Sequence, residues 1–381
     1  MRIGINASFL RKPGTGIGQV TIHFLEKLTE GMANTQQSTF VLYTEEPVDQ
    51  KFPENFEVRS FLPWWKRDDL IRKWLWERQI TKEAKKDGCD VFLSLYQTTT
   101  IFPSSFHHTM VVHDLIPRLF PLYQGNMRQK WYWRAVERGI AKATRIVAIS
   151  EATKNDLVEF GRERNSIEVV YPDSAPLFLE QPSVEDQERV LQKYSLKPGY
   201  IYHGGGLEIR KNGERLLSAY AMLLEKERTS EGLAVPLLVI SGKIFSEENP
   251  LATPVRSCIQ KLNLQGRVRL LDFVPDEDLP ALYKQALFFV YPSLYEGFGL
   301  PVVEALRMGT PVVTSDVSSL PEVALDSALY VDPENVSSIA SGMERLIVDS
   351  ALRASLKQAS STGLDRFAWS NFTNKVLTSL K

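Results

Sequence analysis

One local pattern occurs twice in this chain: a short apolar strand, a run of glycines and then an amphipathic helix. Residues 2–7 (RIGINA) lead into Gly14, Gly16 and Gly18 and a helical segment. Residues 200–206 (YIYHGGG) lead in the same way into a helix predicted over about 212–226. Strands that alternate with helices are typical of parallel α/β sheets. The repeat therefore predicts two doubly wound, Rossmann-like domains in one chain.

Further apolar runs support this α/β reading and place the domain boundary. Each run is too short for a helix and lies beside a helical segment; they are residues 40–44, 90–95, 109–114, 145–150, 236–241, 267–273, 287–293 and 311–315. A proline-bearing segment without strong periodicity, 172–198, predicts the join. We expect an N-terminal domain over 1–172 and a C-terminal domain over 190–364, with a final helix in 365–381 packing back on the first.

Charge and cysteine content narrow the class of protein. The 381 residues carry 45 Lys and Arg against 46 Asp and Glu, a net charge of -1, which argues against a nucleic-acid partner. Cys89 and Cys258 lie far apart and form no disulfide framework or metal cluster. No signal peptide and no membrane-spanning run is found in the sequence, so a cytoplasmic location is expected.

The segment 293–310 (SLYEGFGLPVVEALRMGT) carries the strongest chemical signal. A strand ends before it, Gly299 and Pro301 mark the start of a helix, and free N–H groups at such a start bind anions. Glu304 lies one turn into that helix, where a carboxylate suits hydroxyl groups such as those of a ribose. Glu296 could accept hydrogen bonds from a second sugar. The alternative is a glycine-punctuated turn with two solvated glutamates.

Glu296 and Glu304, with the wording EGFGLPVVEA, resemble the Glu–seven residues–Glu motif of retaining family 4 glycosyltransferases. The resemblance extends to VVHDLIP (111–117), VAISEATK (147–154), GGLEIRKN (205–212) and FVPDEDLPALYKQA (273–286). It implies a GT-B fold, two Rossmann-like domains with the active site between them. It also implies transfer of a hexose from a nucleotide sugar with retained configuration, with no cofactor and no bound metal.

The resemblance assigns roles to individual residues. It implies that Glu304 binds the ribose and Glu296 the donor sugar, and that Lys211 pairs with the diphosphate. It places the backbone of Phe298, Gly299 and Leu300 against sugar and diphosphate, Val274 beside the nucleobase, and Gly16 near a phosphate.

His113 is the third residue, with Lys211 and Glu296, that the resemblance implies for catalysis. It ends the strand MVV, where the family places a contact to the donor sugar; a structural role is the alternative. Asp114 could orient His113 or cap the next turn, and Ser150 could face the same edge or cap a helix.

One departure from the family concerns Arg210. Many members carry an arginine just before the position of Leu207, where this chain has Gly206. Arg210 is the candidate replacement, and a solvated loop charge is the alternative.

Two patterns point elsewhere and are given less weight. Asp276-Glu277-Asp278 spells a D-x-D metal motif, but it follows Pro275 and opens a helical segment, so a helix cap is the better interpretation. Gly14, Gly16 and Gly18 resemble a dinucleotide fingerprint without its third glycine at the required spacing.

Residues 62–86 combine four tryptophans with eight Lys or Arg. A basic helix of this kind can lie on an anionic membrane, which would suit a lipid-linked acceptor at the inner face of the membrane. Packing of the tryptophans on the N-terminal sheet is the alternative.

The sequence therefore predicts a metal-independent, retaining hexosyltransferase with a glycan or lipid-linked saccharide acceptor, acting in surface polysaccharide synthesis. UDP-hexoses such as UDP-glucose are the expected donors and GDP-mannose is the next. The rivals are a sugar-phosphate synthase or phosphorylase of the same fold, a dinucleotide-dependent oxidoreductase, and a catalytically silent sugar-nucleotide-binding protein.

Overall fold

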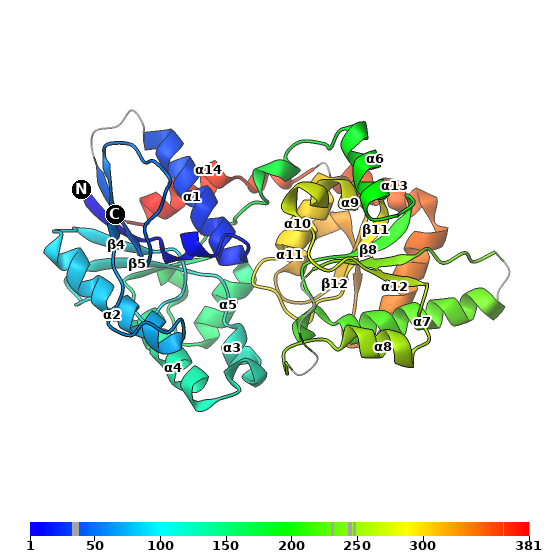
Figure 1. Ribbon diagram of the computed structural model, residues 1–381, viewed down its shortest axis with the longest axis horizontal. Coiled ribbons are helices and arrows are strands. Elements are labelled where there is room, and N and C mark those ends of the chain that lie inside the picture. Colours follow the sequence, from blue (N-terminus) through cyan, green and yellow to red (C-terminus); the bar gives the residue numbers. More distant parts are fainter. Residues whose placement is uncertain (33–37, 230–231, 243–245, 247–248, 361, 381) are drawn as a thin grey trace. The chain divides into compact units, whose positions relative to one another are not determined.

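The computed structural model describes residues 1–32, 38–229, 232–242, 246, 249–360 and 362–380 (Figure 1). The chain forms two compact units. Unit 1 contains residues 1–173 and 367–381, and unit 2 contains residues 174–366. Each unit is built on its own parallel sheet with helices on both faces.

Unit 1 contains a seven-stranded parallel sheet in the order β3-β2-β1-β4-β5-β6-β7. Its strands are β1 (Arg2–Asn6), β2 (Thr39–Thr44), β3 (Phe56–Ser60), β4 (Val91–Ser94), β5 (His107–Val112), β6 (Arg145–Ala148) and β7 (Ile167–Val169). Ile3 of β1 aligns with Phe40 of β2 and with Val91 of β4. Strands β2 and β3 lie on one side of β1 and β4 to β7 on the other, so the strand order reverses between β1 and β4.

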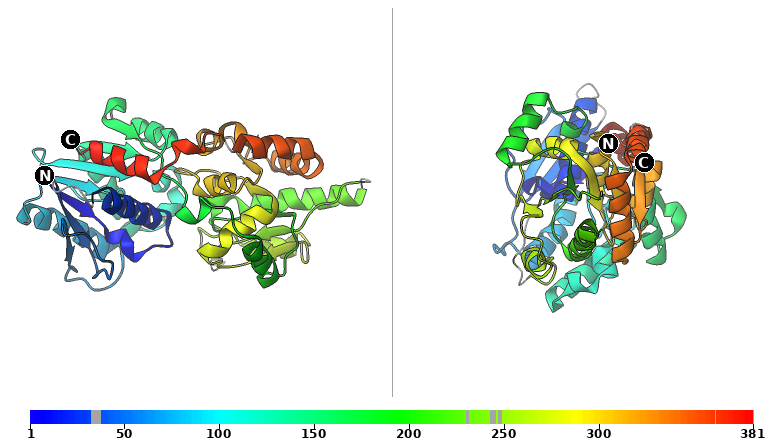
Figure 2. Two further views of the ribbon diagram at one scale, coloured as in Figure 1. Left: turned by 90° about the horizontal axis from the view of Figure 1, so that it is seen from above. Right: turned by 90° about the vertical axis from the view of Figure 1, so that its right-hand side faces the viewer.

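The helices of unit 1 are α1 (Gly16–Met32), α2 (Leu70–Lys86), α3 (Ile116–Leu119), α4 (Met127–Lys142), α5 (Glu151–Glu159) and α14 (Trp369–Thr378). The last helix, α14, lies against α1, although more than 300 residues of chain separate them (Figures 1 and 2). Phe372 is fully buried against Phe24, and the ring of Trp369 lies 5.0 Å from that of His23.

Unit 2 contains a six-stranded parallel sheet in the order β10-β9-β8-β11-β12-β13. Its strands are β8 (Tyr200–His203), β9 (Leu238–Ile240), β10 (Val268–Leu270), β11 (Ala286–Tyr291), β12 (Val312–Ser315) and β13 (Ala328–Val331). Its helices are α6 (Val184–Lys193), α7 (Gly213–Thr229), α8 (Val255–Lys261), α9 (Leu279–Gln285), α10 (Leu300–Arg307), α11 (Leu320–Ala324), α12 (Val336–Val348) and α13 (Ser350–Ser360). The order reverses between β8 and β11.

The prediction of two doubly wound domains is confirmed, while the extent of the expected join is wrong. Residues 184–193, placed in that join, form α6, which packs on α9 and belongs to unit 2. The helix is difficult to recognise because Val190 is its only buried residue and its other positions are largely charged. Strands β3, β7 and β13 were not expected; each is short and incompletely buried.

The tryptophans of 62–86 do not share one environment. Trp76 is fully buried and stacks on Phe61, as the packing alternative predicts, whereas Trp64 is 75% exposed. The helix begins only at Leu70, where the side chain of Asp69 accepts hydrogen bonds from the N–H groups of Ile71 and Arg72. Within the described ranges, no helix combines the length and apolar character needed to cross a bilayer.

Candidate active site

Three of the predicted donor residues of unit 2, Arg210, Lys211 and Glu296, lie together where its strand order reverses, between β8 and β11. Ligands of doubly wound sheets bind beyond the carboxyl ends of the strands at this point. Lys211 follows β8 on a short 3₁₀ helix (Ile209–Lys211), and Glu296 follows β11 by five residues. Their Nζ and Oε1 atoms are 2.7 Å apart.

Asn212 fixes the loop that carries Lys211. It adopts the left-handed conformation with φ 63°, which asparagine tolerates better than most residues. Its side-chain amide donates hydrogen bonds to the carbonyls of Pro292 (2.9 Å) and Pro333 (2.7 Å). The loop after β8 is thereby tied to the end of β11 and to the segment after β13.

Glu296 is nearly buried and accepts hydrogen bonds on both carboxylate oxygens. Oε1 accepts from Lys211, from the Tyr291 hydroxyl at 2.9 Å and from the Ser293 hydroxyl at 2.5 Å; Oε2 accepts from Arg210 at 2.7 Å. Burial acts to raise the pKa of Glu296, but the charges of Arg210 and Lys211 outweigh it and hold that pKa well below its usual range. Glu296 is therefore a carboxylate at neutral pH.

Lys211 is enclosed by the same groups. Its ammonium contacts the Tyr291 hydroxyl and lies 4.9 Å from the centre of that ring. Burial, helped by the nearby charge of Arg210, lowers the pKa of Lys211 to about 8.

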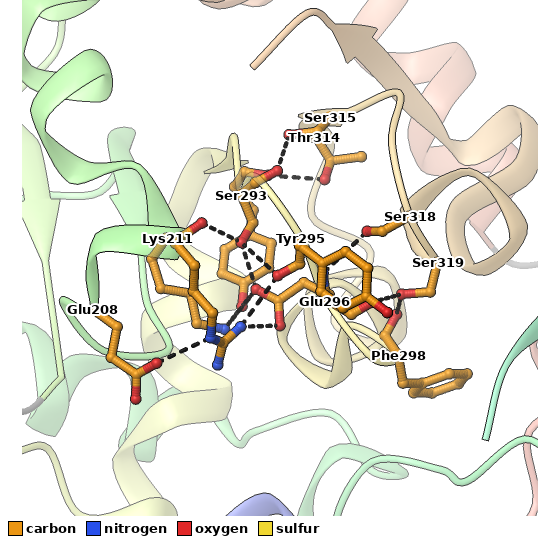
Figure 3. A network of polar contacts seen from close by, with 12 residues as sticks. Glu208, Lys211, Ser293, Tyr295, Glu296, Phe298, Thr314, Ser315, Ser318 and Ser319 are labelled. Carbon is orange, nitrogen blue, oxygen red and sulfur yellow. Dashed lines mark hydrogen bonds and ion pairs between the residues drawn. The ribbon is translucent and has the colours of Figure 1, made fainter. Parts of the chain in front are cut away.

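Arg210 is part of this cluster, so the alternative of a solvated loop charge is wrong. Its side chain is 15% exposed, and it pairs with Glu208 at 2.9 Å as well as with Glu296. Two cations and two carboxylates thus meet at the end of β8 and β11 (Figure 3).

Hydroxyl groups from neighbouring loops hold the segment around Glu296 (Figure 3). Ser319 donates to the carbonyls of Glu296 (3.0 Å) and Phe298 (2.7 Å), and Ser318 accepts from the N–H of Glu296 at 3.0 Å. Ser315 donates to the carbonyl of Ser293 at 2.7 Å. These bonds fix the backbone as it enters α10.

The start of α10 offers backbone donors, as the sequence predicts for an anion site. Gly299 has φ 109°, a conformation that favours glycine, and an added Cβ would lie 2.9 Å from Leu320. The N–H groups of Gly299 and Leu300 donate to no group in the residues that the structure describes. The helix dipole adds a partial positive charge here.

Glu304 lies in α10, and its surroundings differ from those of Glu296. Its Oε2 accepts a hydrogen bond from the Tyr283 hydroxyl at 2.8 Å. Burial raises the pKa of Glu304 to about 7, with the Tyr283 bond acting in the opposite direction. Val274 and Phe298, the other predicted donor-site residues of unit 2, are both buried.

In unit 1, His113 directly follows β5 at the carboxyl edge of the sheet. It is buried, its Nε2 lies 2.9 Å from the carbonyl oxygen of Leu95, and its pKa is lowered to about 4 by burial. The ring is therefore neutral at pH 7. A proton on Nε2 donates to that carbonyl, which leaves the lone pair of Nδ1 as an acceptor.

Asp114 caps the turn that leads into α3, and Ser150 is the N-cap of α5. Asp114 accepts from the N–H of Ile116 at 3.0 Å, and Ser150 accepts from the N–H of Thr153 at 2.9 Å. The capping alternatives for both residues are confirmed.

The glycine loop of unit 1 has two kinds of glycine. An added Cβ on Gly18 would lie 2.0 Å from the carbonyl oxygen of Lys12, so the packing of the loop itself requires glycine there. An added Cβ on Gly16, at the start of α1, would have no described atom within 4 Å. The loop therefore leaves open space beside Gly16.

The interpretation of Asp276-Glu277-Asp278 as a helix cap is wrong, because the side chain of Asp278 bonds to other groups and not to the N–H groups of the helix. Asp278 stands before α9 but makes no capping bond. Its carboxylate is fully buried and binds Arg189 (2.8 Å), Lys193 (2.5 Å) and the Tyr194 hydroxyl (2.8 Å). Asp278 thereby joins α6 to α9.

Sequence reasoning missed several residues that build the site, namely Tyr291, Tyr283, Ser293, Glu208 and Asn212. Tyr291 lies in a predicted strand and Glu208 belongs to the GGLEIRKN motif, so the sequence places both residues near the predicted site. The contacts of Tyr291 with Lys211 and of Asn212 with Pro292 join segments that are about 80 residues apart, which no local pattern reveals.

Models of two glycosyltransferase families match the chain. The model for glycosyl transferases group 1 matches residues 185–362, and that for glycosyltransferase family 4 matches residues 16–172. The crystal structure of WaaG, a glycosyltransferase involved in lipopolysaccharide biosynthesis, superposes with a TM-score of 0.75 and 16% identity over 100% of both chains. The protein belongs to the group 1 glycosyltransferases of family 4 type, and its fold is GT-B.

Two relatives from Escherichia coli are similar in sequence. The chain is 28% identical to O-antigen chain mannosyltransferase B, over 100% of both chains. It is 30% identical to the serotype-specific mannosyltransferase WbdA over 267 residues, which are 68% of this chain and 32% of WbdA.

Proposed function

We propose that this glycosyltransferase moves a hexose from a nucleotide sugar to a saccharide acceptor with retained anomeric configuration. The observation that carries the proposal is that Arg210 and Lys211 pair with Glu296, three residues before Gly299, and that the N–H groups of Gly299 and Leu300 donate to no group in the described residues. Cations and a helix start together suit a diphosphate. Glu304 would bind the ribose and Glu296 the donor sugar.

The chemistry follows from this donor set. Lys211 and the start of α10 would stabilise the charge that develops on the leaving diphosphate. The diphosphate oxygen would accept the proton of the attacking hydroxyl on the same face of the sugar, which retains configuration. Binding requires Lys211 and Arg210 to exchange part of their pairing with Glu296 and Glu208 for the diphosphate. Glu296 would then be released to accept hydrogen bonds from sugar hydroxyls.

The names of the relatives support mannose as the transferred sugar, so GDP-mannose, the second donor that the sequence suggests, is placed ahead of UDP-glucose. A thermal-shift panel of GDP-mannose, UDP-glucose, UDP-galactose and ADP-glucose tests this choice. The true donor at about 100 times its Kd should stabilise the fold by about 2.7 kcal/mol. Turnover of the stabilising donor, with the product's anomeric configuration read by NMR, tests transfer and retention.

No resident metal is needed in this proposal, because the diphosphate would be met by two cationic side chains and a helix start. Activity should survive EDTA. Loss of activity in EDTA and its return with Mn²⁺ would contradict the proposal.

The acceptor would bind to unit 1 and, by analogy with the named relatives, would be an O-antigen saccharide. His113 would accept a hydrogen bond from a sugar hydroxyl through Nδ1, because Nε2 lies against the carbonyl of Leu95. The open space beside Gly16 would admit a phosphate.

A lipid-linked acceptor would bring unit 1 to the inner face of a membrane, and a groove between α2 and α4 supports this location. The groove has a volume of about 980 Å³ and is lined by Trp64, Trp74 and Trp131 together with Arg78 and other basic residues. The Trp74 and Trp131 rings are 4.9 Å apart, and the Arg78 guanidinium lies 4.9 Å from the Trp74 ring. Aromatic rings and basic groups together suit an anionic bilayer surface.

Vesicle flotation tests the membrane contact. Wild-type protein should float with vesicles containing phosphatidylglycerol and stay behind with phosphatidylcholine alone. Trp64→Ser should weaken flotation, because Trp64 is exposed in the groove. Trp369 is buried in α14, so Trp369→Ser shows how a misfolded protein behaves in the same assay. Equal flotation of wild type with both lipids would contradict the electrostatic part of the proposal.

A further inference from the structure

The point in unit 1 where the strand order reverses also carries a lysine, and the donor site does not use it. In unit 2, the corresponding point holds Lys211 over the ring of Tyr291, beside Glu296. In unit 1, β1 and β4 flank the reversal, and Phe9 and Tyr96 follow these two strands. The ammonium of Lys73 lies between them.

Three aromatic rings surround this ammonium. Its Nζ lies 4.7 Å from the ring centre of Tyr96, 5.1 Å from that of Phe9 and 5.4 Å from that of Tyr132. Ring faces attract cations at these distances. The side chain of Lys73 keeps 26% of its surface exposed, so the cage is open to a ligand.

Glu77 holds the aromatic rings around Lys73 in place but forms no hydrogen bond with the Lys73 ammonium. Its carboxylate is fully buried and accepts four hydrogen bonds: from the hydroxyls of Tyr96 (2.9 Å) and Tyr132 (3.0 Å), and from the N–H (3.0 Å) and hydroxyl (2.6 Å) of Thr99. Its nearest approach to Lys73 is 4.0 Å. The Lys73 ammonium donates no hydrogen bond to any residue in the described ranges, so its donors are available.

The surroundings of Lys73 disfavour a positive charge, so a stabilising role for the folded protein does not explain why a lysine is found there. Lys73 lies in the first turn of α2, where the helix dipole opposes positive charge. Burial lowers its pKa, and the charges of Lys12 and Arg11 act in the same direction, against Glu77 and Glu45. A lysine kept in such surroundings is a candidate for ligand binding.

Nearby acids are already engaged by arginines. Arg11 pairs with Asp68 at 3.0 Å and with Glu45 at 3.3 Å, and Arg72 pairs with Glu45 at 3.0 Å. Lys12 forms no ion pair within the described part of the chain. Among the described residues, Lys12 and Lys73, the latter 4.0 Å from Glu77, are thus more available to an anion than Arg11 and Arg72.

We propose that Lys73 binds a phosphate group of the acceptor, a deepening that rests on the proposed glycosyl transfer to a saccharide held by unit 1. The phosphate could belong to a phosphorylated sugar or to a lipid diphosphate carrier. Both present the same ligand chemistry, an anionic ester oxygen that takes hydrogen bonds from an ammonium.

The experiment uses the full chain in excess GDP and, separately, in excess UDP, so that the phosphate site of unit 2 is occupied. Mannose 6-phosphate, farnesyl diphosphate and uncharged methyl α-mannoside are then titrated separately by calorimetry. We expect at least one phosphate probe to bind, and Lys73→Met to weaken that probe by roughly ten- to hundredfold. The probe that binds better identifies the source of the phosphate.

Lys85→Met is the matched control, because Lys85 lies on the same helix and is exposed. It should leave all titrations unchanged. Lys73→Gln provides a second variant, with a polar side chain, if the methionine variant does not fold. Unchanged phosphate binding in folded Lys73 variants, or binding of neither phosphate probe by wild type, would overturn the proposal. Failure of the proposed function is distinct, since it appears as no turnover with any donor while these titrations remain measurable.

Discussion

Glu296 and Glu304 are separated by seven residues, yet their surroundings shift their pKa values in opposite directions. Arg210 and Lys211 keep Glu296 ionised, whereas burial raises the pKa of Glu304 to about 7 against the opposing hydrogen bond from the Tyr283 hydroxyl. The sequence motif indicates both glutamates and their chemical type. It does not reveal the shifts, because these depend on how deeply the folded protein buries each carboxyl group and on the charges of Arg210 and Lys211 from another segment of the chain.

Nucleotide-sugar binding should therefore depend on pH. A deprotonated Glu304 accepts both ribose hydroxyls, so affinity should increase as the pH is raised through about 7. It should decrease again above about 8, where Lys211 loses its charge. Calorimetry with the intact nucleotide sugar is preferred, because the terminal phosphate of a free diphosphate titrates near pH 6. Glu304→Gln should remove only the rising limb; a rising limb that persists in this variant would exclude Glu304 as its cause.

Glu208 should limit the affinity for diphosphate, because it competes for Arg210. Glu208→Gln removes one carboxylate from the cluster and should strengthen binding of the nucleoside diphosphate by roughly two- to fivefold. Glu214→Gln is the control, since Glu214 is exposed at the start of α7. Weaker binding by the Glu208 variant alone would show that Glu208 orders Arg210 and does not compete with the ligand.

At the level of elements, the sequence predicts best the strands that are buried on both faces. β1, β4, β8 and β11 read as continuous apolar runs and were expected at nearly the observed positions. The edge strands β3 and β13 are partly exposed and short, so they lack that signal. Helix α6 was missed because charged residues fill it, and its attachment depends on Asp278 of a distant segment.

Helix α14 should contribute strongly to the stability of unit 1. Phe372 is fully buried between Phe24 and Trp369, so Phe372→Ala should lower the free energy of unfolding of unit 1 by about 3–5 kcal/mol. Asn371→Ala, an exposed neighbour on the same helix, should change it little. Hydrogen exchange resolved by segment can assign the loss. If residues 174–366 lost as much hydrogen-exchange protection as unit 1, the prediction that Phe372→Ala destabilises unit 1 alone would be contradicted.

At the scale of the molecule, each unit has a core and a sheet of its own, so unit 2 should fold in isolation. The fragment 174–366 contains Arg210, Lys211, Glu296 and Glu304. We expect it to bind the nucleoside diphosphate with an affinity close to that of the full chain, measured by calorimetry. Glu304→Gln within the fragment should weaken that binding. A folded fragment without affinity would mean that unit 1 supplies essential nucleotide contacts.

The contact of α14 with α1 makes unit 1 discontinuous in the chain. A ribosome releases α1 well before α14, with the whole of unit 2 synthesised in between. Unit 2 can therefore complete its fold during translation before α14 has been synthesised, whereas unit 1 is completed only when α14 has emerged and docks on α1. Until then, the apolar surface around Phe24 stays uncovered, so a nascent chain truncated before residue 367 would be a natural client for chaperones.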